Sequence, residues 1–139
     1  EFCDFGEKHM FVHHIGYYVT NLEESKKKFE CLGYVVEQSV VYDFQRGIKV
    51  LFLNGDSVRI ELIEIVDREH CDIEHMRYNK GACPYHICYE VENIELAIEE
   101  LKKQHFKIIR KKAKAKAINY RTVVFLYNKN VGMIELVER

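Results

Sequence analysis

The stretch His14-Ile15-Gly16-Tyr17-Tyr18-Val19, with Asn21-Leu22-Glu23 after it, has a second copy in the chain. The second copy reads His86-Ile87-Cys88-Tyr89-Glu90-Val91, with Asn93-Ile94-Glu95 after it. Two later stretches recur in the same order: Val50-Leu51-Phe52-Leu53 as Val123-Val124-Phe125-Leu126, and Ile60-Glu61-Leu62-Ile63-Glu64 as Ile134-Glu135-Leu136-Val137-Glu138. Internal repetition dictates the architecture into which every motif must fit. The sequence therefore predicts two copies of one module.

Each copy reads as a strand, a helix and three further strands. Side chains alternate along a strand, so Ile15, Tyr17 and Val19 share one face and His14 lies on the other. The first helix is expected to start at the N-cap Asn21 and end at Gly33. Its predicted apolar stripe is Leu22, Phe29 and Leu32. The second helix has Asn93 as its cap, and its predicted stripe is Ile94, Ala97, Ile98 and Leu101.

The remaining strands divide the chain into modules. They are expected near residues 34–41, 46–53, 57–66, 106–112, 121–127 and 131–138. Module one covers residues 11–66, a polar connector with one helical turn covers 67–83, and module two covers 84–139. Residues 1–10 are expected to be an extension or a tag remnant outside the fold. The pattern predicts a single domain of the α+β class.

Four polar residues occupy equivalent places in the two copies. His14 and His86 lie in the first strand of each copy, and Glu61 and Glu135 lie in the last. All four are predicted on the face opposite the helix. Two sheets curved toward each other would aim them into one hollow. Two neutral imidazoles and two carboxylates balance a divalent cation and suit Zn²⁺, Ni²⁺, Co²⁺ or Mn²⁺.

Each member of this set has an ordinary alternative, since a single strand histidine is more often a hydrogen-bonded core residue and a strand glutamate usually faces water. The repeat makes four independent coincidences improbable. His13 is expected on the opposite face and outside the site. His70, Cys71 and His75 fit no common zinc spacing and are read as surface residues. The basic run includes Lys102, Lys103, Lys107, Arg110, Lys111, Lys112, Lys114 and Lys116; it is read mainly as a solvated edge, with a phosphate-bearing substrate tail as the alternative.

Composition limits the partners. Lys and Arg total 21 against 22 for Asp and Glu, which gives a net charge of −1 and no general attraction to nucleic acid or an anionic membrane. No apolar run approaches the ~20 residues of a membrane span. The five cysteines form no Cys-x-x-Cys pair, which favours reduced thiols and a cytoplasmic setting.

On the quoted stretches, the sequence from about Phe11 to Arg139 resembles the vicinal oxygen chelate superfamily, which includes glyoxalase I, methylmalonyl-CoA epimerase, extradiol dioxygenases and bleomycin-resistance proteins. The resemblance implies tandem βαβββ modules that form a curved, eight-stranded open barrel around a metal. The family's four ligand positions match His14, Glu61, His86 and Glu135. Extradiol enzymes use two histidines and one carboxylate, so Glu61 as a fourth ligand counts against them.

Two enzyme subclasses remain. The sequence is similar to methylmalonyl-CoA epimerase from Gln45-Arg46-Gly47 through Ile60-Glu61-Leu62. It departs from that enzyme in two later places. A Gly-Ala-His-Gly-like turn is replaced by Lys114-Ala115-Lys116-Ala117-Ile118-Asn119, and the proline that usually follows Phe-Leu-His is missing after Phe125-Leu126-Tyr127. The full ligand set and compact chain also resemble bacterial glyoxalase I-like proteins.

The leading expectation is a metal-dependent enzyme of the glyoxalase I type, a lyase or isomerase that moves a proton at a carbon next to a carbonyl. Glu135 and Glu61 are the expected bases. The first alternative is epimerisation of the methylmalonyl-CoA type, and the second is a binding protein that sequesters a small molecule, such as an antibiotic, without catalysis. A small-molecule substrate and a homodimer are expected. The metal, the substrate and the division of roles between the two glutamates stay open.

Overall fold

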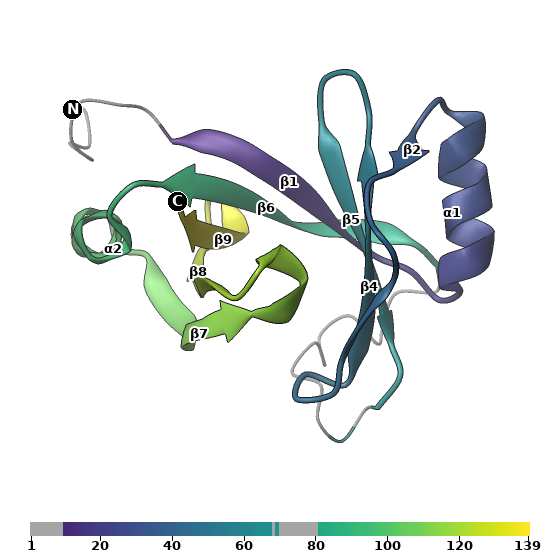
Figure 1. Ribbon diagram of the computed structural model, residues 1–139. Helices are drawn as coiled ribbons and strands as arrows, with labels where there is room; N and C mark the ends of the chain where they lie inside the picture. The colour runs from purple at the N-terminus through teal and green to yellow at the C-terminus, as the bar shows by residue number, and fades with distance from the viewer. Residues whose placement is uncertain (1–9, 68, 70–80) are drawn as a thin grey trace. The chain divides into compact units, whose positions relative to one another are not determined.

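The computed structural model of the 139-residue chain describes residues 10–67, 69 and 81–139 (Figure 1). Its elements are β1 (Phe11–Tyr18), α1 (Leu22–Cys31), β2 (Val35–Val36), β3 (Val41–Asp43), β4 (Ile48–Asn54), β5 (Arg59–Ile65), β6 (Cys83–Val91), α2 (Ile94–Lys103), β7 (Lys107–Ala115), the 3₁₀ helix η2 (Lys116–Ile118), β8 (Arg121–Asn128) and β9 (Gly132–Glu138). The chain divides into two compact units: the first begins at His14 and ends at Tyr85, and the second combines residues 10–13 with His86–Arg139.

In the first unit the strand order is β2-β4-β5-β1, and β3 also pairs with β4. β4 and β5 are antiparallel, whereas β1 runs parallel to β5 with Gly16 opposite Glu61. The prediction of one strand over 34–41 is wrong. Val36 pairs with Leu53 and Val41 pairs with Val50. More residues lie between Val36 and Val41 than between Leu53 and Val50 on β4. The extra residues have no partner on β4, so the predicted strand is divided into β2 and β3. The described residues therefore contain nine strands instead of eight.

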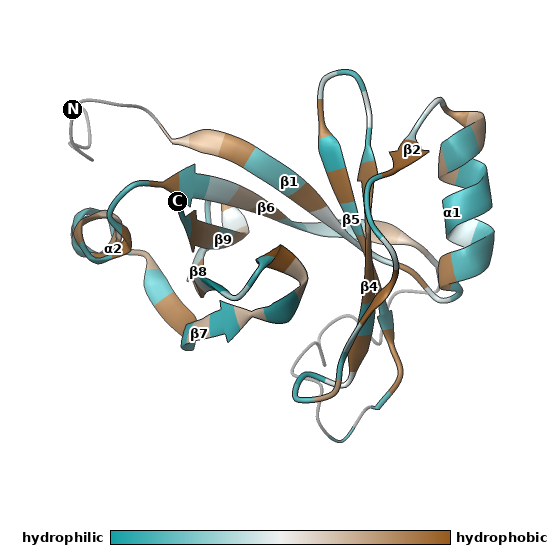
Figure 2. Cartoon of the chain, viewed as in Figure 1, coloured by the Kyte–Doolittle hydropathy of each residue, from teal (hydrophilic) through white to brown (hydrophobic). Residues whose placement is uncertain are grey.

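The helix α1 packs lightly on its sheet. Leu22 is its one buried residue, and it joins a cluster with Val19, Leu51, Leu53, Ile60 and Leu62. Most of the remaining helical surface is hydrophilic (Figure 2). The prediction that Leu32 is buried is wrong, because Leu32 is the C-cap and its side chain is 74% exposed. Gly33 follows with a φ of 99°, a conformation that glycine adopts without a Cβ clash, and it ends the helix as predicted.

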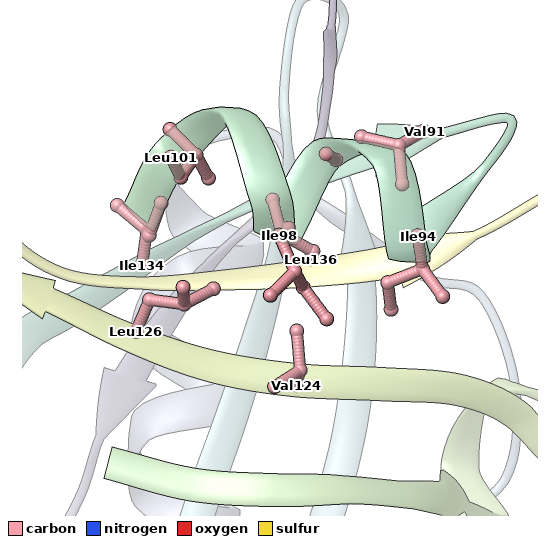
Figure 3. Packing of buried hydrophobic residues seen from close by; sticks show 9 residues of the cluster. Val91, Ile94, Ile98, Leu101, Val124, Leu126, Ile134 and Leu136 are labelled. Atoms are coloured by element: carbon pink, nitrogen blue, oxygen red, sulfur yellow. The ribbon is translucent and has the colours of Figure 1, made fainter. Parts of the chain in front are cut away.

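The second unit has the strand order β6-β9-β8-β7. β6 runs parallel to β9 with Cys88 opposite Glu135, which repeats the β1–β5 register of the first unit. The helix α2 lies over β8 and β9 (Figure 3). Its predicted stripe is confirmed: Ile94, Ala97, Ile98 and Leu101 are buried against Val91, Val124, Leu126, Ile134 and Leu136. Met10 packs at the edge of this cluster.

Both helices begin in the same way. The side chains of Asn21 and Asn93 accept hydrogen bonds from the backbone N–H groups of Glu24 and Leu96, as the N-cap prediction requires. The first helical N–H group of each helix donates to a glutamate of the last strand: Leu22 to Glu64 at 2.7 Å and Ile94 to Glu138 at 3.0 Å. The second glutamate of each Ile-Glu-Leu-x-Glu stretch therefore ties its helix to its sheet.

Part of the sequence interpretation falls outside the described residues. His70, Cys71 and His75 lie there, as does most of the connector with its expected helical turn. Among the described cysteines, Cys31, Cys83 and Cys88 form no disulfide bond. The 3₁₀ helix η2 follows β7 and was not predicted.

Candidate active site

In the first unit, two adjacent parallel strands bring His14 to Glu61. The histidine lies on β1, two residues before Gly16, whose register partner on β5 is Glu61. The His14 Nε2 atom is 3.3 Å from the Glu61 Oε1 atom, and the two side chains are 0% and 9% exposed. Both residues lie on the face opposite α1, as the strand alternation predicted.

The second unit repeats this arrangement. His86 lies on β6, two residues before Cys88, whose register partner on β9 is Glu135. The His86 Nε2 atom is 3.0 Å from the Glu135 Oε1 atom, and the side chains are 0% and 3% exposed. The structure therefore unites the four predicted ligands as two equivalent histidine–glutamate pairs, one in each unit.

A phenylalanine accompanies each pair. Phe52 is opposite Glu61 on β4 and Phe125 is opposite Glu135 on β8. Each phenylalanine ring makes a T-shaped contact with a histidine ring: the centroids of His14 and Phe52 are 5.2 Å apart and those of His86 and Phe125 are 5.3 Å apart. Sequence reasoning missed both aromatic residues as site residues. The signal was present, since Phe52 and Phe125 lie at equivalent positions of a quoted repeat.

The donor atoms of each pair have a separation that suits metal ligation. Zn–N and Zn–O bonds of about 2.0–2.2 Å place two adjacent ligands of one ion roughly 3–3.5 Å apart. The separations of 3.3 and 3.0 Å fall in this range. The sheet faces that carry the pairs are otherwise largely apolar and buried, with Val50, Ile63 and Val123 between 1% and 2% exposed. Buried carboxylates in such surroundings need a compensating charge. The residues of both pairs therefore fit a divalent transition metal.

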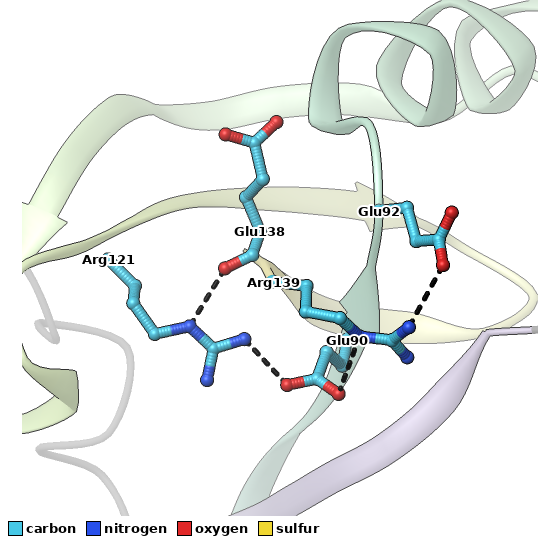
Figure 4. Close-up of polar contacts among 5 residues, drawn as sticks. All are labelled: Glu90, Glu92, Arg121, Glu138 and Arg139. Atoms are coloured by element: carbon cyan, nitrogen blue, oxygen red, sulfur yellow. Dashed lines mark hydrogen bonds and ion pairs between the residues drawn. The ribbon is translucent and has the colours of Figure 1, made fainter.

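A cluster of charged residues in the second unit is joined by hydrogen bonds and ion pairs (Figure 4). Arg121 donates from Nη2 to Glu90 at 2.6 Å and from Nε to the Glu138 carbonyl at 2.8 Å, and Arg139 joins Glu90 to Glu92. Burial raises the pKa of Glu90, but the hydrogen bond from Arg121 and the charges of Arg121, Arg139 and His13 outweigh it and hold the pKa below its usual value. Glu90 is therefore ionised at neutral pH.

His13, on β1, is half-buried. In the part of the chain that the structure describes, no helix is long and apolar enough to span a membrane.

Comparison with known proteins assigns the family. Residues 13–125 match the model of the Glyoxalase/Bleomycin resistance protein/Dioxygenase superfamily. The chain belongs to this superfamily. The predicted family and the α+β fold of tandem βαβββ modules are thereby confirmed.

The comparisons with individual proteins include two named epimerases and one hypothetical protein. The chain is 30% identical over 128 residues to the mitochondrial methylmalonyl-CoA epimerase of Homo sapiens, an alignment that covers 91% of this chain and 71% of that one. A hypothetical protein from Bacillus halodurans C-125 has a similar structure, with a TM-score of 0.81, 24% identity and coverage of 95% and 96% of the two chains. The methylmalonyl-CoA epimerase of Mycobacterium tuberculosis gives a TM-score of 0.75 with 21% identity, over 91% of this chain and 86% of that one.

The similarity to the human epimerase supports an enzyme of the isomerase class. It favours the epimerase alternative of the sequence analysis over the leading expectation of a glyoxalase I-type lyase. The sequence could not separate the two reactions, because both begin with the removal of a proton from a carbon next to a carbonyl. The same four residues are compatible with either reaction.

Proposed function

We propose that this chain is a divalent-metal-dependent epimerase that inverts a carbon next to a thioester carbonyl, with methylmalonyl-CoA as its substrate. The observation that carries the proposal is the repeated pair of buried histidine and glutamate, His14 with Glu61 and His86 with Glu135. The similarity to a human methylmalonyl-CoA epimerase supplies the substrate class.

In this proposal both pairs hold one ion. Two neutral imidazoles and two carboxylates compensate the charge of Zn²⁺, Ni²⁺, Co²⁺ or Mn²⁺, whereas Ca²⁺ and Mg²⁺ prefer more oxygen ligands. A bound divalent ion would supply Lewis acidity that stabilises the negative charge developing on the substrate. The ring contacts of Phe52 and Phe125 restrict the orientation of the histidines, which keeps each Nε2 atom directed at its glutamate.

The two glutamates move the proton. A carboxylate oxygen of Glu135 takes the proton from the carbon, and the electron pair of the broken C–H bond passes toward the thioester carbonyl oxygen. The carboxyl group of Glu61, which has first taken a proton from solvent, delivers that proton to the opposite face of the same carbon, and Glu135 afterwards releases the proton it removed to solvent. For the opposite epimer the two glutamates exchange roles. The burial of both side chains limits competition from bulk water.

Solvent deuterium exchange tests the function. The protein, loaded in turn with Co²⁺, Ni²⁺ and Zn²⁺, is incubated in D₂O with methylmalonyl-CoA and, separately, with the hemithioacetal of methylglyoxal and glutathione. We expect deuterium at the methyl-bearing α-carbon of the first substrate together with equilibration of the two configurations at that carbon. Conversion of only the second would replace the epimerase by a glyoxalase, and tight binding without any exchange would favour a sequestering protein.

Two variants test the roles of the glutamates. Glu135→Gln and Glu61→Gln keep the shape of the side chains but remove the base, so each is expected to lower turnover by at least about a hundredfold. Unchanged turnover in either variant would exclude that residue as a base. Because each variant also alters a ligand, metal content is measured alongside turnover.

Metal stoichiometry tests whether the pairs share an ion. One equivalent per chain that is lost in both His14→Ala and His86→Ala supports the shared site, and two equivalents would contradict it. We also propose a homodimer, which light scattering measures directly. If the shared site forms across the dimer, mixing the two alanine variants restores part of the metal binding.

A further inference from the structure

The edge strand β7 contains two irregularities that change which residues face the site. Lys107 is opposite Tyr127 and Arg110 is opposite Phe125, so three steps on β7 match two on β8. A second shift of the same size separates Arg110 from Ala113, which is opposite Val123. These are β-bulges, which redirect side chains and are common beside active sites.

The first bulge exchanges an isoleucine for an arginine. In a regular ladder the partner of Phe125 would be Ile109, and Arg110 would face the other side of the sheet. In the structure Ile109 is instead 50% exposed, while Arg110 lies on the face that carries Phe125 and Glu135. Exposing an isoleucine and turning a charge toward a largely buried face both oppose stability. A local rule broken in this way is typical of a functional position.

Arg110 lies close to the second histidine–glutamate pair. Its Cζ atom is 5.5 Å from the centroid of the Phe125 ring, and that centroid is 5.3 Å from the centroid of His86. Since both distances share the Phe125 ring, the Cζ atom of Arg110 is within about 11 Å of the centroid of the His86 ring. The ring of Phe125 supports the flat guanidinium by a cation–π contact and limits its freedom.

One basic residue accompanies Arg110 on its face of the sheet. Lys107 lies on the same face three residues earlier and is exposed. Lys112 pairs instead with Glu95 of α2, and Lys114 donates to Thr122, so these two lysines belong to the other face. The acidic residue Glu90 of this sheet is already engaged by Arg121 and Arg139. The face of β7 next to Phe125 therefore presents positive charge, and its natural ligand is an anion.

We propose that Arg110, assisted by Lys107, binds an anionic group of the substrate, a phosphate or a carboxylate, and thereby determines which thioesters the enzyme accepts. This inference rests on the proposed epimerase function. It assigns Arg110 a role in specificity and not in the proton transfer. An arginine is well suited to it, because its fork of N–H groups binds either anion with two hydrogen bonds.

Kinetics with two substrates test the inference and identify the anion. Arg110→Met keeps the hydrocarbon stem that packs on Phe125 but removes the charge. We expect it to raise the KM for methylmalonyl-CoA about tenfold or more, with a smaller effect on kcat, and to abolish most of the salt dependence of KM. Methylmalonyl-pantetheine retains the carboxylate and lacks the phosphates. A KM raised only for the CoA ester identifies a phosphate, and a KM raised for both identifies the carboxylate.

Lys111→Met is the matched control, since it removes one charge from the next residue of the same strand, which has no register partner on β8. Its KM values are expected within twofold of those of the unsubstituted chain. Arg110→Lys keeps the charge and is expected to recover part of the affinity for the substrate. If Arg110→Met shows no cooperative thermal unfolding, Arg110→Lys is used in its place. KM values for both substrates within twofold in the Arg110 variants, or no larger than in the control, would overturn the inference.

Failure of the proposed function is distinguishable from failure of this inference. The binding of unacylated CoA and of methylmalonate is measured by calorimetry without any turnover. If no thioester exchanges deuterium but one of these two anions binds more weakly to Arg110→Met than to the control, the epimerase proposal fails and the anion site stands. If neither ligand distinguishes the two variants and no KM changes, the anion site is wrong while the epimerase proposal is unaffected.

Discussion

The ring of Phe125 meets the ring of His86 edge-on, with an interplanar angle of 84° and 5.3 Å between the centroids. Phe52 and His14 repeat the contact at 78° and 5.2 Å. Edge-to-face contacts of this kind stabilise by ~0.5–1.5 kcal/mol beyond burial and also select one ring orientation. Each phenylalanine is therefore expected to orient the histidine ring of its histidine–glutamate pair.

Phe125→Leu tests this action. The leucine fills much of the volume, so we expect a loss of about 1–2 kcal/mol in the free energy of unfolding together with a roughly tenfold weaker affinity for Zn²⁺ or Co²⁺. Chemical denaturation and competition with a chromogenic chelator measure the two effects. Ile134→Val, in the cluster under α2, is expected to cost a comparable ~1 kcal/mol without changing metal affinity. Equal metal affinities in both variants would contradict an orienting role for Phe125.

Metal binding is expected to stabilise the fold. An ion that binds the folded chain and not the unfolded one adds about 2.7 kcal/mol to the free energy of unfolding at a hundredfold excess over its Kd. Thermal unfolding with and without Co²⁺ measures the gain, which Glu135→Gln is expected to reduce strongly. A transition temperature that does not respond to Co²⁺, Ni²⁺, Zn²⁺ or Mn²⁺ would count against the metal centre.

The lowered pKa of Glu90 predicts a pH-dependent contribution to stability. The folded pKa lies below the ordinary value of 4.5, so the contribution is complete above about that pH and is lost as the pH falls through the folded pKa. Glu90→Gln is expected to lower the free energy of unfolding by about 0.5–1 kcal/mol at pH 7, since water screens this partly exposed group. The difference from the unsubstituted chain should shrink as the pH falls below the ordinary pKa of a glutamate. Urea titrations across this range measure it, and a difference independent of pH would refute the ionic explanation. Glu92→Gln, more exposed, is the control.

The two helix caps are chemically equal but their helices are packed differently. α2 buries four residues, whereas α1 buries only Leu22. Asn93→Ala is therefore expected to cost about 1 kcal/mol in global unfolding. Asn21→Ala is expected to act mainly by local opening, because a lightly packed helix separates before the sheet does. Hydrogen exchange resolved by segment distinguishes the two, and equal global losses without faster exchange in α1 would contradict the difference.

Much of the fold and half of the site geometry could be predicted from the sequence. Alternation and repetition placed His14 and Glu61 on one face and His86 and Glu135 on the equivalent face, because a strand with one apolar face can pack in only one orientation. The caps Asn21 and Asn93 were readable for a similar reason, since side-chain capping depends on residues only three positions apart.

Other features depend on contacts between distant segments. The edge contact of Phe125 with His86 and the capping of α2 by Glu138 depend on strand register, which pairs residues far apart in the sequence. The bulge that turns Arg110 inward depends on how two strands of unequal residue count accommodate each other. The sequence by itself determined the repeated module, the two helices and the residue types of the site. The tertiary structure alone decided which side chains accompany each pair, because local patterns fix the face on which a residue lies but not the neighbours it meets across the sheet.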